Sequence, residues 1–199
     1  MTKVKICGVQ RIEDVEYLNA AKPDYAGFVF ARSRRQITKE QAITLRMSLD
    51  EDIPAVGVFV NELPKVAGYY GENNVVDLIQ LHGQEDERYL SYLRQYTACE
   101  IIQAFPIQTE DDIRRAGESS ADYILLDNKT AGSGECFDWS LIGKVERPFF
   151  LAGGLNQENI AEAIEHFHPF ALDISSGVET DGYKDKEKIE MCVRRIRNV

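Results

Sequence analysis

Short apolar runs and amphipathic stretches alternate along the whole chain. Eight apolar runs have the length and composition of buried strands, and they lie at residues 4–6, 25–30, 55–60, 78–81, 101–105, 123–126, 149–151 and 170–174. Between them, apolar residues recur at helical spacing in stretches such as 12–20, 39–47, 86–96, 156–165 and 186–196. Strands that alternate with helices are typical of a parallel sheet covered by helices. Eight such units predict an α/β protein with a (β/α)8 (TIM) barrel fold.

Local signals refine this arrangement. Thr38 and Asn156 each precede a helical stretch and are predicted N-caps. The sequence Gly-Tyr-Tyr-Gly at 68–71 is interpreted as a helix end. The connection from 127 to 138 is rich in Gly, Ser, Thr and Asn and longer than an ordinary barrel turn, so it is predicted to be a functional loop or lid. No linker or low-complexity tract divides the chain, and residues 1–199 are expected to form a single domain.

Charge and composition exclude several functions. The net charge of −10 argues against a general partner for nucleic acid or for a membrane surface, which would need a basic footprint. The chain has no apolar stretch of the roughly 18 residues that span a membrane and no signal-peptide pattern at its N-terminus, so a cytoplasmic location is expected. The four cysteines lack zinc-site spacing, which predicts free thiols and no metal site.

The last two apolar runs end in small residues. Gly153 and Gly154 follow the seventh run, and Ser175, Ser176 and Gly177 follow the eighth. Such residues let backbone N–H groups and hydroxyls approach a phosphate without obstruction from larger side chains. Barrels of this class frequently hold phosphate after strands seven and eight. These five residues are therefore predicted to bind phosphate.

Two groups at strand ends are candidates for proton transfer. A lone Cys7 is more often a small buried hydrophobe, but alternation along the strand places both Lys5 and Cys7 inside the barrel, where a cation would favour loss of the thiol proton. Asp127 ends an apolar strand and is about equally well explained as a carboxylate that braces a loop. Strands one and six lie nearly across a barrel from each other. A base and an acid that face each other suit a proton-relocating isomerisation that needs no cofactor.

Further polar residues at strand ends are candidates for substrate binding. Three arginines occur at 32, 34 and 35; a solvated basic turn explains Arg32 and Arg34, whereas at least one of the three could hold a substrate carboxylate in a bidentate manner. Asp173 shares the inward parity of Ser175 and is expected to pair with Lys5 or an arginine rather than react. His82 either binds substrate or caps the following turn, and binding is favoured.

Eight short motifs occur in order along the chain: KICG at 5–8, GFVF with SRR at 27–35, VGVFVN at 56–61, QLHG at 80–83, LLD at 125–127, FDW at 137–139, GGLNQENI at 153–160 and DISSGVE at 173–179. Together they resemble the phosphoribosylanthranilate isomerase family of tryptophan biosynthesis. The resemblance implies an Amadori rearrangement of a small phosphoribosyl substrate without a cofactor. It further implies that Cys7 is the general base, Asp127 the general acid and Arg35 the residue that holds the anthranilate end, while the glycine and serine corners bind phosphate.

Alternatives stay open at this point. Other phosphosugar barrels, such as a pentose-phosphate epimerase or an indole-forming synthase, need metal ligands or a lysine and glutamate set at strand ends. A non-catalytic barrel that only binds sugar phosphates would show affinity without turnover. The sequence is compatible with a monomer or a homodimer.

Overall fold

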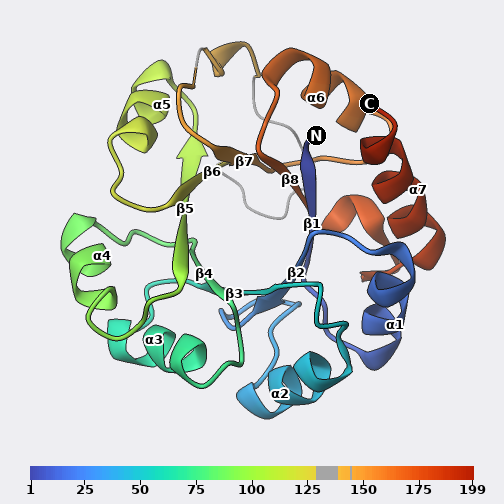
Figure 1. The fold of residues 1–199 in the computed structure, drawn as a ribbon. Coiled ribbons are helices and arrows are strands. Elements are labelled where there is room, and N and C mark those ends of the chain that lie inside the picture. The colour runs from blue at the N-terminus through green and yellow to red at the C-terminus, as the bar shows by residue number, and fades with distance from the viewer. Residues whose placement is uncertain (129–138, 144) are drawn as a thin grey trace.

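The computed structural model describes residues 1–128, 139–143 and 145–199. Its centre is a closed barrel of eight parallel strands that pair in sequence order, with β1 closing against β8 (Figure 1). The strands are β1 (Lys3–Cys7), β2 (Tyr25–Val29), β3 (Ala55–Phe59), β4 (Leu78–Leu81), β5 (Glu100–Ile107), β6 (Tyr123–Asn128), β7 (Phe149–Leu151) and β8 (Ala171–Ile174). The predicted barrel is confirmed, and every predicted strand is present within one or two residues of its predicted ends. Except for residues 127 and 128, the predicted loop at 127–138 lies outside the described residues.

Helices surround the barrel on its outer side (Figure 1). They are α1 (Ile12–Ala21), α2 (Lys39–Ser48), α3 (Pro64–Glu72), α4 (Glu87–Leu93), α5 (Glu110–Gly117), α6 (Ile160–Phe167) and α7 (Lys186–Arg197), with 3-10 turns η1 (Trp139–Leu141) and η2 (Ser176–Val178). The five predicted helices are all present, but α4 is shorter than the stretch 86–96 that predicted it. None of the helices that the structure describes is long and apolar enough to cross a membrane.

Two of the local predictions are confirmed, and one is wrong. Thr38 caps α2 as expected, because its side chain accepts a hydrogen bond from Gln41 N at 3.2 Å. Asn156 does not cap α6, which begins at Ile160 after Asn159; the Asn156 side chain instead accepts from Glu158 N at 2.8 Å in the preceding turn. The Gly-Tyr-Tyr-Gly segment lies at the C-terminal end of α3, which ends at Glu72, as predicted. Its glycines pack closely against Tyr96 and the residues that follow it, and this close packing explains glycine at both positions.

The buried apolar side chains form two layers. One layer lies between the strands and the helices and includes Val4 and Ile6 of β1. The other fills the barrel interior and consists of Tyr25, Val56, Leu78, Ile102, Ala104, Leu125, Phe150, Ala152 and Ala171. Because side chains alternate along a strand, Lys5 and Cys7 lie on the interior side of β1, as predicted.

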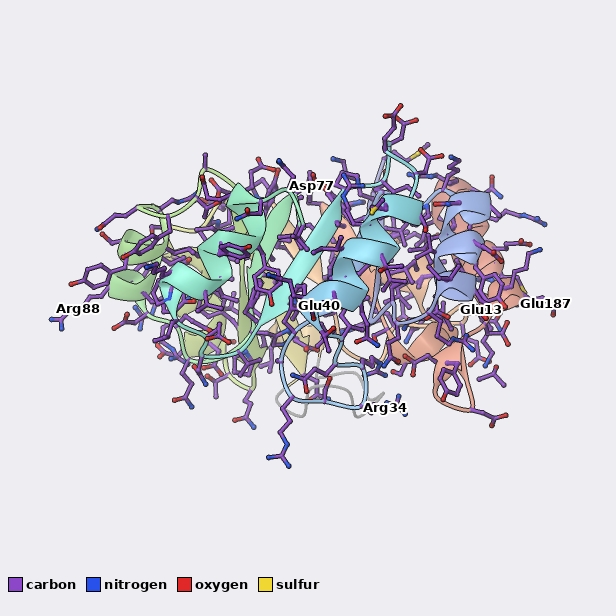
Figure 2. The ribbon with its side chains drawn as sticks, turned by 90° about the horizontal axis from the view of Figure 1, so that it is seen from below. Glu13, Arg34, Glu40, Asp77, Arg88 and Glu187 are labelled. Carbon is purple, nitrogen blue, oxygen red and sulfur yellow. The ribbon has the colours of Figure 1, made fainter. Side chains whose placement is uncertain are left out.

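A short hairpin after η2 was not predicted. It pairs β9 (Glu179–Thr180) with β10 (Tyr183–Lys184) through a turn in which Asp181 and Gly182 both have positive φ. Figure 2 shows the molecule from the side, with Arg34 after β2 at one end of the barrel and Asp77, which precedes β4, at the other. The hairpin reaches the end that carries Arg34, because Glu179 contacts that arginine at 2.7 Å.

Candidate active site

Cys7 is the last residue of β1 and lies opposite Gly27 of β2. A Cβ atom at Gly27 would lie 2.8 Å from Cys7 Sγ, so glycine at this position leaves room for the thiol. Ser175 Oγ donates a hydrogen bond of 3.0 Å to the Cys7 carbonyl oxygen. The candidate base therefore lies in a buried position beside the corner that follows β8.

An ion pair lies inside the barrel below the thiol. Lys5 Nζ is 2.8 Å from Asp173 Oδ2, and the Lys5 side chain has no exposed surface. Burial by itself lowers the pKa of Lys5, but the Asp173 carboxylate and Cys7 more than offset this, so that the pKa lies above its usual value. The pairing with Lys5 was one of the two alternatives predicted for Asp173. The other carboxylate oxygen of Asp173, Oδ1, is buried and has no hydrogen-bond partner in the described part of the chain.

The expected effect of Lys5 on Cys7 is only partly correct. Lys5 does lower the pKa of the thiol, but burial raises it more strongly and the Asp173 carboxylate adds to the increase. The net pKa lies above the ordinary value, which contradicts the predicted depression. Burial of the thiolate away from water costs more free energy than its interaction with one ammonium group recovers.

Asp127 lies near the end of β6 and contacts three neighbours. Its Oδ2 is 3.1 Å from His82 Nε2, and its Oδ1 accepts a hydrogen bond of 2.7 Å from Asn128 N. A Cβ atom at Gly153 would lie 3.0 Å from Oδ1, so the corner after β7 closely approaches the carboxyl group. The candidate acid is thus next to the predicted phosphate site.

His82 connects Asp127 to the barrel interior. Gln80 Nε2 is 3.0 Å from His82 Nδ1. With this amide orientation Gln80 donates to Nδ1, so the imidazole proton is on Nε2 of His82 and is donated to Asp127. The alternative that His82 caps the turn after β4 is wrong. Glu85 stabilises that turn instead and connects it to the loop after β3, because its carboxylate accepts hydrogen bonds from Gly83 N at 2.8 Å and Asn61 N at 2.6 Å. Sequence reasoning missed both Gln80 and Glu85.

The two predicted phosphate corners meet in the structure. Gly153 and Gly154 have φ values of +86° and +64°, which glycine adopts without strain. A side chain at Gly177 would collide with the carbonyl oxygen of Leu155, so the corner after β8 rests directly on the chain that follows β7. Asn159 Nδ2 donates to the Gly154 carbonyl oxygen at 3.1 Å and supports the corner after β7.

Arg35 belongs to a cluster that sequence reasoning did not find. Its Nε and Nη2 atoms lie 2.7 Å and 2.9 Å from the two carboxylate oxygens of Glu179. Glu179 also contacts Arg34 at 2.7 Å and Lys184 at 2.8 Å. Burial would raise the pKa of Glu179, but hydrogen bonds and charges from Arg35 and Lys184 lower it overall. Arg32 is exposed, which agrees with the predicted solvated turn.

No group of three or more His, Cys, Asp or Glu side chains could hold a metal ion among the residues that the structure describes. Cys7, Cys99 and Cys192 are free thiols, as predicted. Cys136 lies outside the described residues.

Fold and site together define a class: a (β/α)8 barrel that gathers a thiol, a carboxyl group paired with histidine and two glycine-containing corners at the carboxyl ends of its strands. Comparison with known proteins identifies the family. The model of the family described as N-(5'-phosphoribosyl)anthranilate (PRA) isomerase matches residues 4–195, and the chain belongs to this family.

Relatives and solved structures agree with this assignment. N-(5'-phosphoribosyl)anthranilate isomerase of Clostridium kluyveri is 45% identical over the full length of both chains, and that of Streptococcus pneumoniae is 45% identical over all of this chain and 97% of the relative. The crystal structure of phosphoribosylanthranilate isomerase from Thermotoga maritima is 36% identical and covers both chains fully with a TM-score of 0.91. Another structure of such an isomerase, in complex with reduced 1-(o-carboxyphenylamino)-1-deoxyribulose 5-phosphate, is 35% identical with a TM-score of 0.88 over both full chains.

Proposed function

We propose that this chain catalyses the Amadori rearrangement of N-(5-phosphoribosyl)anthranilate to 1-(2-carboxyphenylamino)-1-deoxyribulose 5-phosphate, a step of tryptophan biosynthesis, with Cys7 as general base and Asp127 as general acid. The observation that carries these assignments is the strand order at one end of the barrel. Asp127 is on β6, Cys7 is on β1, and the two glycine corners follow β7 and β8 between them. A sugar whose phosphate is bound at these corners would have the acid on one side and the base on the other.

The proposed reaction is a net isomerisation in which protons pass between the substrate and two side chains. Asp127 donates a proton to the ring oxygen, the bond from that oxygen to C1 breaks, and the nitrogen lone pair forms a Schiff base with C1. The Cys7 thiolate then removes the proton from C2, which gives an enolamine. Ketonisation of the enolamine moves the Cys7 proton to C1 and the proton of the C2 hydroxyl to the Asp127 carboxylate, through solvent, so that both side chains regain their starting protonation. The hydrogen bonds from His82 and the Asn128 N–H to Asp127 stabilise the carboxylate that remains after proton donation. Proton transfer by positioned side chains needs no cofactor.

Lys5 supports the second step. The ammonium group lies inside the barrel on the same face of β1 as the thiol, and its charge lowers the pKa of Cys7 against the effect of burial. Its own pKa is raised, so the cation persists at neutral pH. Lys5 therefore stabilises the thiolate form that accepts the proton from C2.

The remaining site residues are assigned to binding. Gly153, Gly154, Ser175, Ser176 and Gly177 form the phosphate site, because small residues after β7 and β8 let a phosphate approach backbone N–H groups.

Arg35 binds the carboxylate of the anthranilate ring. Asp173 Oδ1, a buried acceptor without a hydrogen-bond partner among the described residues, suits a substrate hydroxyl, and His82 lies beside the proposed acid, Asp127.

Two other classes predict different behaviour. A non-catalytic sugar-phosphate barrel would bind a product analogue without turnover. A metal-dependent epimerase would lose activity in chelator, whereas the proposed isomerase keeps it. The family match favours the isomerase.

A fluorescence assay with freshly prepared phosphoribosylanthranilate, with and without chelator, tests the proposal. Wild-type protein should turn substrate over in both conditions. Cys7→Ser and Asp127→Asn should each lower kcat by about 10²-fold to 10⁴-fold, the usual contribution of a positioned acid or base. Both variants should bind a reduced product analogue with nearly unchanged affinity. Cys99→Ser is the matched control, because this thiol lies outside the barrel interior and its loss should leave kcat unchanged. Full turnover in both site variants would refute the catalytic assignments.

Assembly and location remain predictions. Another crystal structure similar to this chain is of monomers generated from the dimeric phosphoribosylanthranilate isomerase of Thermotoga maritima, 36% identical over both full chains with a TM-score of 0.88. For this chain we infer a monomer or a homodimer in the cytoplasm, and sedimentation analysis of the purified protein decides between the two states.

A further inference from the structure

We infer that Glu179 and Lys184 are positioning residues that hold Arg35 with one edge of its guanidinium group open for a substrate carboxylate. This inference rests on the proposed function, because it takes Arg35 as the residue that binds the anthranilate carboxylate. Glu179 and Lys184 do not touch the substrate themselves. They act through Arg35.

The guanidinium group can hold a carboxylate by two different edges. One edge consists of Nε and Nη2 and the other of Nη1 and Nη2, and each presents two parallel N–H donors. Glu179 occupies the first edge, with distances of 2.7 Å and 2.9 Å. Within the described part of the chain, Arg35 Nη1 has no hydrogen-bond partner. The second edge is therefore available for a bidentate contact with a carboxylate of the substrate.

Glu179 is itself held in place by Lys184. Lys184 Nζ donates to Glu179 Oε1 at 2.8 Å and to the Ser175 carbonyl oxygen at 3.0 Å. Only 1% of the Lys184 side chain and 5% of the Glu179 side chain are exposed. The carboxylate that holds Arg35 is thus anchored to the backbone of the predicted phosphate corner. This arrangement sets the distance between the two anion-binding parts of the site.

The aliphatic part of Arg35 is also held in place. Gly8, which follows Cys7, has φ of +86°, and a Cβ atom there would collide with Arg35 Cδ. The arginine side chain therefore passes directly across Gly8. Glycine at this position gives Arg35 a path next to the candidate base.

The cluster has an excess of positive charge. One carboxylate, that of Glu179, faces Arg34, Arg35 and Lys184, in a chain whose net charge is −10. The Arg34 side chain is 57% exposed, but that of Arg35 is only 11% exposed. Burial and the charge of Arg35 lower the pKa of Lys184 against the effect of Glu179. A substrate anion would offset the surplus charge that a single glutamate leaves.

Steady-state kinetics with two substrates that differ only in their amine component test this inference. One substrate is phosphoribosylanthranilate, and the other is phosphoribosylaniline, which lacks the carboxylate. Glu179→Gln replaces one acceptor with a donor that faces Arg35. It should raise KM for the first substrate about tenfold, which corresponds to about 1.4 kcal/mol, with little change in kcat. For phosphoribosylaniline, KM should equal that of the wild type. Glu179→Asp keeps the negative charge that pairs with Lys184, but its shorter side chain should not reach both nitrogens of Arg35, and it should show the same selective increase.

Three further variants complete the design. Arg35→Ala should remove the dependence on the carboxylate, and Arg35→Ala with Glu179→Gln should be no worse than Arg35→Ala alone. Arg34→Ala is the matched control, because it removes a cation that contacts the same glutamate from the exposed side, and it should leave both KM values unchanged. Equal KM increases for both substrates, or unchanged KM in both Glu179 variants, would overturn the inference. If Arg35→Ala leaves KM for phosphoribosylanthranilate unchanged, or raises KM equally for both substrates, the proposed role of Arg35 is wrong as well.

Discussion

Replacement of Lys5 by methionine should strongly destabilise the protein. Lys5 is wholly buried, and its ammonium group neutralises Asp173, whose side chain is only 7% exposed. The variant leaves a buried carboxylate without its cation, and Oδ1 of that carboxylate already has no partner among the described residues. Breaking a buried ion pair in this way costs about 3–5 kcal/mol. This loss is large relative to the roughly 5–15 kcal/mol that stabilise a typical domain.

Urea unfolding followed by circular dichroism and by fluorescence of Trp139 measures this loss. The Lys5→Met and Asp173→Val double variant serves as the control, because it removes both charges. Its free energy of unfolding should return to within about 1 kcal/mol of the wild type or exceed it, as found when a whole buried pair is replaced by apolar residues. A loss below about 1 kcal/mol in Lys5→Met, or a double variant as unstable as the single one, would refute the argument that an unpaired charge causes the effect.

The pH dependence gives a second check. Because the pKa of Lys5 is raised in the folded state, its contribution is fully present below the unfolded value of about 10.4. The contribution is lost as pH rises above 10.4 through the folded pKa. The difference in stability between wild type and Lys5→Met should therefore be constant near neutral pH and become smaller in strongly alkaline buffer. In Lys5→Met, kcat/KM should also decrease at neutral pH, because the cation that lowers the pKa of Cys7 is absent.

Two other substitutions have clear expected outcomes. Gly177→Ala places a methyl group against the carbonyl oxygen of Leu155 and should weaken binding of the product analogue, measured by calorimetry, at least about tenfold; unchanged affinity would show that the two corners do not need to touch. Asp112→Ala removes the carboxylate that accepts hydrogen bonds from Gln108 N and Thr109 N at the start of α5, and urea unfolding at pH 7 should show a loss of about 1 kcal/mol. Burial by itself raises the pKa of Asp112, but hydrogen bonds from Arg115 and these backbone groups lower it to about 2. The loss of stability in the variant should therefore shrink as pH falls from about 4 towards 2. A loss of stability that does not depend on pH would contradict this.

The barrel was predictable because its determinants are local. Each strand is an apolar run bounded by turn residues, and alternation along β1 correctly placed Lys5 and Cys7 inside the barrel. The start of α6 was not predictable in this way. Asn156 and Asn159 both have side chains that can cap a helix, and the chain forms one more turn before the helix begins at Ile160.

Parts of the site depend on contacts that the sequence does not display. Arg35 and Glu179 are far apart along the chain, and only barrel closure between β1 and β8 brings them together. The sequence also shows which charges are near Cys7 but not how strongly the thiol is buried. Burial is the larger effect, and for this reason the predicted direction of its pKa shift was wrong.

The contact between Gly177 and Leu155 has a consequence for protein engineering. Loops of (β/α)8 barrels are often treated as interchangeable modules, each replaceable without regard to its neighbours. Here the backbone after β8 fits against the backbone after β7 with no space for a single methyl group. A chimera that receives only one of these loops from another barrel would juxtapose two surfaces that were not shaped for each other. The two segments should be transplanted as one unit.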